Sequence, residues 1–304
     1  MRRRILFVVI IILIVVGADF LIGLVSGSLI KNAPDVGINQ TNTAQALFKR
    51  EADVLVLGSS RANHSFDSRV LEHELGKSVY NAGRDGQNIV YDVMVLSAYL
   101  ERCTPKMLVL DMTSSMMSDD WNAALSEMNC YYGLSKSVDS VIEERSSWVE
   151  MLKLQSNIYR YNNTWQWLLK AYTGKEATLD GYRPMPVNEA GSMKATYKDN
   201  DDFKLDSTNL VMLEALVKTC REKKIKLVLT YSPTLSVTRH GFIDWLSEYG
   251  SKHHLLFYNA MMDSDFLNHP ELFYDYTHLN ENGAKVFSKK FCEWLKKNQS
   301  VAKS

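Results

Sequence analysis

Residues 54–61 read VLVLGSSR, four apolar residues followed by a glycine, two serines and an arginine. An unbroken apolar run of this length is typical of a parallel strand that helices cover on both faces. The glycine and the two serines predict a tight turn directly after that strand. A serine hydroxyl in such a turn becomes a nucleophile when a neighbouring base takes its proton. The stretch therefore predicts both a central strand and a reactive side chain at its end.

Residues 275–280 read DYTHLN and supply the groups that such a serine requires. Asp275 and His278 lie three residues apart, just before a predicted helix over residues 284–295. An imidazole can take the proton of a serine, and a carboxylate fixes the tautomer and orientation of that imidazole. We therefore predict that His278 is the base and that Asp275 orients it.

Four further apolar runs alternate with helical patterns and predict the rest of a sheet. They cover residues 79–80, 107–110, 227–230 and 255–258. Strands separated by helices imply right-handed crossovers and a parallel sheet. Sites in such sheets form beyond the carboxyl ends of the strands. The serine turn, the segment around Gly83 and the segment after residue 110 all follow predicted strands, so we expect them at one edge.

An acyl-transfer site also needs hydrogen-bond donors aimed at the developing oxyanion. We predict the backbone N–H groups at the Ser60 turn and at Gly83 as these donors. A glycine at position 83 would let a backbone amide approach a substrate without a Cβ in the way.

The motifs together resemble those of the SGNH/GDSL hydrolase superfamily, from residue 53 to residue 295 apart from an insertion. Residues 58–60, Gly-Ser-Ser, match the family's Gly-Asp-Ser, and this match assigns the nucleophile to Ser60. Gly83 matches the glycine of the second block, and Asp275 and His278 match the last block. The resemblance implies an α/β fold, a flavodoxin-like three-layer α/β/α sandwich with a central parallel sheet. It also implies a serine hydrolase that acts on ester bonds.

One block departs from the family pattern. The family's third block is Gly-x-Asn-Asp, whose Asn side chain completes the oxyanion hole. Residues 111–115 read DMTSS and contain no Asn. A hydroxyl of Thr113 or Ser114 would substitute; otherwise the oxyanion hole has two donors, or the insertion supplies the third.

Arg61, directly after the serine, also differs from the usual sequence of the family motif. It is a candidate for binding an anionic group of the substrate. The alternative is an ion pair with Asp85 or Asp111, and this structural role is the favoured interpretation.

The N-terminus carries a membrane signal. Three arginines at residues 2–4 precede a run from Ile5 to Val16 without a polar residue, and apolar residues continue to residue 30, interrupted by Asp19. A membrane span needs about 20 residues, so we predict a transmembrane helix over residues 1–30, with Asp19 near the outer interface or facing a partner. The arginines predict a cytoplasmic N-terminus and an extracytoplasmic domain. The apolar residues beyond Ala18 favour a retained single-pass anchor over a signal peptide cleaved after Ala18.

The remaining organisation follows from composition. We predict a linker and lead-in over residues 31–52, a hydrolase domain over 53–298 and a tail over 299–304. A long helical insertion at about 112–224 separates the third and fourth strands and exceeds any usual crossover. Its helical part, residues 138–172, contains three tryptophans: Trp148, Trp165 and Trp167. Packing within the insertion is the favoured role of these tryptophans, and lining a glycan groove is the alternative.

Other classes of function are not supported by the sequence. The formal net charge is zero and no basic stripe stands out, so no nucleic-acid partner is expected. The chain has neither a CxxC pair nor an HExxH motif, so no metal and no cofactor are expected. The four cysteines are interpreted as small buried hydrophobic residues, with one disulfide as the alternative outside the cytoplasm.

These observations predict a membrane-anchored, extracytoplasmic serine esterase or O-acyltransferase that acts on acylated carbohydrate of the cell envelope. The carbohydrate comes only from analogy with anchored family members. The alternative is a non-catalytic envelope-binding or assembly protein that keeps the SGNH fold. The sequence names no protein partner.

Overall fold

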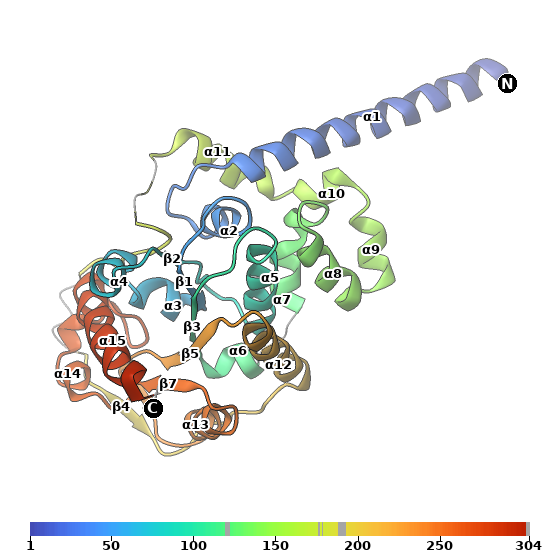
Figure 1. Cartoon of the computed structure of the whole chain (residues 1–304). Coiled ribbons are helices and arrows are strands. Elements are labelled where there is room, and N and C mark those ends of the chain that lie inside the picture. Colours follow the sequence, from blue (N-terminus) through green and yellow to red (C-terminus); the bar gives the residue numbers. More distant parts are fainter. Residues whose placement is uncertain (119–121, 176, 178, 188–192, 302–304) are drawn as a thin grey trace.

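A five-stranded parallel sheet forms the centre of the molecule, as the computed structural model shows (Figure 1). The model describes residues 1–118, 122–175, 177, 179–187 and 193–301. The strand order is β2-β1-β3-β5-β7, and every neighbouring pair is parallel. The strands are β1 (Val54–Gly58), β2 (Val79–Asn81), β3 (Met107–Asp111), β5 (Lys226–Tyr231) and β7 (Leu256–Asn259). All five predicted strands are therefore present, and the parallel arrangement is confirmed.

Helices cover both faces of this sheet, so successive strand residues enter different cores. Leu55 and Leu57 pack with α2 (Asn39–Phe48), α5 (Ile89–Tyr99), α12 (Ser207–Glu222) and α13 (Phe242–Lys252). Val54 and Val56 face the other core, formed with α3 (Ser60–Ser65), α4 (Ser68–Leu75), α14 (Ser264–Leu267) and α15 (Glu281–Val301). This alternation explains the apolar VLVL run. It confirms the three-layer α/β/α sandwich.

The segment between β3 and β5 is mostly helical, as predicted. It contains α6 (Ser114–Ser118), α7 (Asn122–Met128), η1 (Asn129–Tyr131), α8 (Lys136–Arg145), α9 (Trp148–Lys153), α10 (Asn157–Tyr161) and α11 (Thr164–Thr173). A short strand, β4 (Thr196–Lys198), pairs with β6 (Ser236–Thr238). The last helix, α12, packs against α5 and β5 and is the crossover helix of the sandwich. The inserted part therefore ends before Ser207, earlier than the predicted residue 224.

The three tryptophans of the insertion have different environments. Trp167 is buried and belongs to the core shared with the sandwich. Trp148 on α9 is 77% exposed and Trp165 on α11 is 43% exposed. Core packing therefore accounts for one of the three.

The N-terminal segment forms α1 (Arg2–Asn32), a continuous helix whose first half projects away from the domain (Figure 1). Its length and apolar composition are sufficient to cross a membrane. The predicted linker over residues 31–52 is different in the structure, because it contains α2, in which residues 41–47 are buried. Asn42 shows why a polar segment packs here: its side-chain amide donates to the backbone oxygens of Asn81 and Gly181, at 3.0 and 3.1 Å. A satisfied amide can be buried at little cost.

The C-terminal helix α15 extends to Val301, and residues 302–304 of the predicted tail lie outside the described residues. A 3₁₀ turn, η2 (Pro270–Leu272), precedes the loop that carries Asp275 and His278. The four cysteines are unpaired, and Cys220 and Cys292 are buried.

Candidate active site

Ser60 is the first residue of α3 and lies at the carboxyl end of β1. The turn between the two elements depends on Gly58, which has a φ of +134°. A Cβ at this position would also collide with the backbone oxygen of Asp111 and lie 2.9 Å from the Cβ of Ala62. Only glycine fits this close approach of β1, β3 and α3. Because Ser60 begins a helix, its N–H has no partner within that helix and is a candidate oxyanion donor.

The structure brings Ser60, His278 and Asp275 into one chain of hydrogen bonds. The Ser60 Oγ lies 2.8 Å from His278 Nε2, although the two residues are 218 positions apart. His278 Nδ1 lies 2.8 Å from Asp275 Oδ2 and 3.0 Å from Asp275 Oδ1. A carboxylate only accepts, so the proton of a neutral imidazole is on Nδ1. Nε2 is then free to accept the hydrogen of Ser60.

The carboxylate of Asp275 is held by its own loop. Its Oδ1 accepts hydrogen bonds from the N–H of Thr277, at 2.8 Å, and of His278, at 2.9 Å. Burial raises the pKa of Asp275, but the hydrogen bonds from His278 and Thr277 outweigh it and leave the pKa below its usual value. The loop is fixed in turn by Thr234 and Leu235, which both donate to the backbone oxygen of Tyr276. Asp275 is therefore ionised and rigidly placed at neutral pH.

Gly83 lies beside the same turn. A Cβ on Gly83 would come within 2.8 Å of the N of Asn63 and 2.9 Å of the Cβ of Ala62. The N–H of Gly83 donates to the side-chain oxygen of Asn81 at 3.0 Å, while the amide of Asn81 donates to the backbone oxygens of Ala62 and Phe66. To serve an oxyanion, this N–H would have to leave Asn81. The role of Gly83 as a donor stays a prediction.

The strand β3 ends in the buried carboxylate of Asp111. Asp111 accepts hydrogen bonds from the hydroxyls of Thr230 and Ser232, both at 2.8 Å, and from the N–H of Ser232 at 2.9 Å. Burial raises the pKa of Asp111 despite these donors and nearby Arg61. Thr113, two residues further on, is nearly buried, and its hydroxyl lies 3.1 Å from the hydroxyl of Ser115. Thr113 as an oxyanion donor stays a prediction.

Arg61 points into the interior, where its guanidinium is engaged. Nε donates to the hydroxyl of Ser232 at 3.0 Å and Nη2 donates to the backbone oxygen of Ser232 at 2.5 Å. The guanidinium also lies 4.1 Å from the centre of the Tyr231 ring and 4.0 Å from the carboxylate of Asp111. Of the two partners expected for an ion pair, the structure has Asp111. Substrate binding by Arg61 stays a prediction, which these contacts disfavour.

A second histidine, which was not predicted from the sequence, lies at the site. His64 lies four residues after Ser60 on α3, and its ring meets the His278 ring edge to face at 5.7 Å. Its Nδ1 lies 2.6 Å from the backbone oxygen of Arg183 and its Nε2 lies 3.0 Å from Asp85 Oδ1. The i, i+4 spacing was the available signal, because such residues share a helix face. Nothing local to Arg183 indicates that it reaches this site from the insertion.

Asp85 joins His64 to Arg183, whose Nη1 lies 3.0 Å from Asp85 Oδ2. Burial raises the pKa of Asp85, but His64 and Arg183 outweigh it and hold that pKa well below its usual range. Within this cluster the ring of His64 contacts the imidazole of His278, and Asp85 and Arg183 hold the His64 ring in place.

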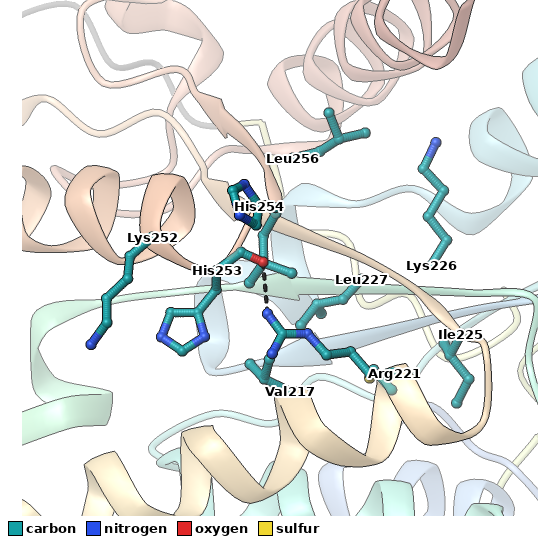
Figure 2. A pocket seen from close by; sticks show the side chains of 11 residues that line it. Val217, Arg221, Ile225, Lys226, Leu227, Lys252, His253, His254 and Leu256 are labelled. Carbon is teal, nitrogen blue, oxygen red and sulfur yellow. Dashed lines mark hydrogen bonds between the residues drawn. The ribbon is translucent and has the colours of Figure 1, made fainter. Parts of the chain in front are cut away.

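A cavity lies at the opposite edge of the sheet from Ser60 (Figure 2). It measures about 720 Å³ and is lined by residues 225–227, residues 252–256 and part of α12. Lys226 begins β5 and Leu256 begins β7, so these are the amino ends of the strands. Figure 2 shows Arg221 donating to the backbone oxygen of His253, at 2.8 Å. The cavity is thus separate from the Ser60 site, which lies at the carboxyl ends.

No protein-family model and no curated protein matches the sequence. Among solved structures, one similar chain is described as a lipolytic protein of the G-D-S-L family from Desulfitobacterium hafniense. The identity is 12%, the TM-score is 0.39, and the match covers 79% of this chain and 97% of the other. A second is described as an acylhydrolase from Bacteroides fragilis, with 11% identity, a TM-score of 0.41 and coverage of 81% and 86%. At these identities the likeness concerns the fold, and the named activities belong to those proteins.

Proposed function

We propose that this SGNH/GDSL-fold chain is a serine hydrolase that cleaves ester bonds through an acyl-enzyme on Ser60. The observation that supports it most is the hydrogen-bond chain from Ser60 through His278 to Asp275. The oxygen of Ser60 attacks the ester carbonyl while His278 takes its proton. His278 then gives the proton to the departing alcohol oxygen as the C–O bond breaks. In the second half, an acceptor oxygen attacks the acyl carbon, His278 takes the acceptor's proton, and the proton returns to Ser60.

We also propose which molecules accept the acyl group and where in the cell the domain lies. Water as the acceptor gives an esterase, and a sugar hydroxyl gives an O-acyltransferase. The apolar helix α1 and the arginines before it support a single-pass anchor with the domain outside the cytoplasm. Acylated carbohydrate of the cell envelope is the substrate class we propose for a domain in that position.

A serine-directed test examines the acyl-enzyme directly. Ser60→Ala removes the attacking oxygen, and we expect aryl-acetate turnover to fall by on the order of 10³-fold or more. Labelling by a fluorophosphonate should be lost at the same time. Ser59→Ala is the matched control, because Ser59 is the adjacent hydroxyl and makes no side-chain hydrogen bond at the start of α3. Unchanged turnover in Ser60→Ala would contradict the mechanism.

The choice between hydrolysis and transfer needs a separate measurement. If the acyl-enzyme reacts slowly with water and needs a sugar acceptor, we expect a burst of aryl alcohol followed by a slow steady state. Adding the right sugar acceptor should raise the steady-state rate and yield an acylated sugar detectable by mass spectrometry. A steady state that no sugar accelerates would favour the esterase.

A non-catalytic envelope-binding role is the second candidate. Two observations favour it: residues 111–115 contain no Asn, and the N–H of Gly83 is occupied by Asn81. Both weaken the expected oxyanion hole. This role predicts that Ser60→Ala leaves the function of the protein in the cell unchanged, whereas the hydrolase predicts its loss with the fold intact.

A further inference from the structure

Exposed apolar side chains concentrate in one short part of the insertion. Outside residues 1–32, thirteen large apolar side chains are exposed among the described residues, and seven of them fall within residues 147–173. These seven are Trp148, Val149, Leu152, Ile158, Trp165, Leu169 and Tyr172. Trp148 is 77% exposed and Leu152 is 65% exposed. A group of this size on a soluble surface signals a binding partner.

The same helices are fastened to the helix that would cross the membrane. Asp19 of α1 accepts hydrogen bonds from the hydroxyl of Ser156 and from the N–H groups of Asn157 and Ile158, at 2.9, 3.0 and 2.9 Å. Ser156 is the N-cap of α10, and Asn157 and Ile158 are its first two residues, so a side chain of α1 caps α10. One turn further along α1, a Cβ on Gly23 would collide with the side chain of Asn157. The position of α10 along α1 is therefore fixed near residues 19–23.

The length of the apolar run sets the depth of this contact. A hydrocarbon core about 30 Å thick needs about 20 helical residues at about 1.5 Å each. Residues 5–18 supply only about 21 Å, so a span that begins at Ile5 ends near Leu24. Asp19 then lies roughly 8 Å below the outer hydrocarbon boundary. A carboxylate at that depth requires compensating donors, which the first turn of α10 provides.

Because α10 reaches this depth, α9 is held beside it. The hydroxyl of Tyr159 on α10 donates to Glu150 on α9 at 2.7 Å. Figure 1 shows α9 and α10 on the side of the domain from which α1 projects. On α11, the hydroxyl of Tyr172 donates to the backbone oxygen of Leu29 of α1 at 2.9 Å. All three helices are thus tied, directly or through α10, to α1.

The charge of this segment also suits a lipid surface. Residues 147–173 contain three basic residues, Lys153, Arg160 and Lys170, and one acidic residue, Glu150, which gives 3 − 1 = +2. Glu150 is engaged by Tyr159 and by Lys153. Exposed aromatic and aliphatic side chains beside lysines are typical of helices that lie in the headgroup region.

We propose that residues 147–173 form a membrane platform, which lies at the boundary between the headgroups and the hydrocarbon core of the leaflet next to the domain. Its partner is the phospholipid bilayer that α1 crosses. The inference rests on the anchoring part of the proposed function and is independent of the chemistry at Ser60. α1 and the platform together hold the domain at two places, so the domain is fixed in height and in tilt.

A depth probe on the full chain tests the platform. Cys103 and Cys130, which are partly exposed, are first replaced by serine. A nitrobenzoxadiazole dye is then attached to single Leu152→Cys, Val211→Cys or Ile11→Cys variants in vesicles of phosphatidylcholine and phosphatidylglycerol. Val211 on α12 is a matched control, because it is an exposed aliphatic residue outside the platform.

We expect spin-labelled lipid to quench the dye at positions 152 and 11 at least twofold more than the dye at position 211. Quenching at 11 without quenching at 152 overturns the platform and leaves the anchor intact. Absence of quenching at both positions overturns the anchor and the platform together. Ester turnover by the same preparations reports on the Ser60 chemistry separately, so the failure of one proposal is distinguishable from the failure of the other.

Discussion

Under the proposed mechanism, the position of one proton on His278 determines whether Ser60 can act as the nucleophile. With Asp275 as the partner, Nδ1 carries the hydrogen and Nε2 accepts from Ser60. In Asp275→Asn the new amide can still accept from the N–H of Thr277 but presents its NH₂ to Nδ1. The imidazole then carries its hydrogen on Nε2, which can no longer accept. We expect turnover to fall on the order of 10³–10⁴-fold with little change in melting temperature. Turnover within tenfold of the parent would contradict the tautomer argument.

The carboxylate of Asp85 should make the melting temperature depend on pH. Its folded pKa is depressed below the ordinary 3.8 because His64 and Arg183 outweigh burial. Stability from the ionised form is therefore complete above about pH 4 and is lost as the pH falls through the depressed pKa. We expect Asp85→Asn to lower the melting temperature by on the order of 2–4 °C at pH 7, with a difference that shrinks below pH 3.8.

The control for this measurement is Asp199→Asn, because the side chain of Asp199 is 92% exposed. Its melting temperature should follow that of the parent at every pH. A difference for Asp85→Asn that stays constant down to the lowest pH would argue against the ionised carboxylate as its source.

At the residue scale, sequence patterns located the three side chains that the structure joins by hydrogen bonds, but not their surroundings. Ser60, Asp275 and His278 were predictable because each lies in a short local motif, and the structure places them within hydrogen-bond distance. The contact of Arg183 with Asp85 joins residues 98 positions apart, and neither lies in a motif. Side-chain partners of this kind are decided by tertiary packing, which leaves no local pattern.

Among the elements, the meeting of α3 with the end of β2 allows a stability test. Gly83→Ala places a Cβ 2.8 Å from the N of Asn63, which is backbone and cannot move aside. We expect a loss of about 1–3 kcal/mol in the free energy of unfolding and lower turnover, because α3 carries Ser60. Gly250→Ala is the matched control, since its nearest neighbour would be 3.6 Å away and the residue lies in α13. It should be neutral or stabilising by up to about 1 kcal/mol. Equal effects of both variants on denaturant unfolding would refute the packing argument.

Apolar elements were easier to predict from the sequence than polar elements, because hydropathy marks a buried segment only when that segment is apolar. The central strands β1 and β3 are almost wholly apolar because both of their faces are buried, so hydropathy alone located them. The helix α2 reads NQTNTAQALF and was interpreted as a linker, because its buried amides and hydroxyls look like those of a loop. The helix α12 is amphipathic but follows a long insertion, so its place as the crossover became visible only from its packing on α5.

For the whole molecule, the link between α1 and α10 should be measurable as exchange of backbone hydrogens. Asp19→Ala removes the acceptor of the N–H groups of Asn157 and Ile158. Loss of a helix cap costs about 1–2 kcal/mol, so we expect these two amides to exchange on the order of 5–30-fold faster. Amides of α13 are the internal reference and should be unaffected. Unchanged exchange at Asn157 and Ile158 would show that α10 stays on α1 without Asp19.

The burial of α2 has a consequence for which substrates the protein can meet. If the 22 residues 31–52 were a flexible chain, their root-mean-square end-to-end distance would be roughly 25 Å. The distance between the domain and α1 could then vary on that scale. Because α2 packs against α5, these residues do not provide that freedom of movement. Under the proposed anchoring, Ser60 stays at a constant distance from the lipid, and a polymeric substrate of the proposed class must bring its ester groups to that distance. A glycine-serine segment inserted between α1 and α2 would leave that distance unchanged, because Asp19 and Leu29 of α1 still bind α10 and α11.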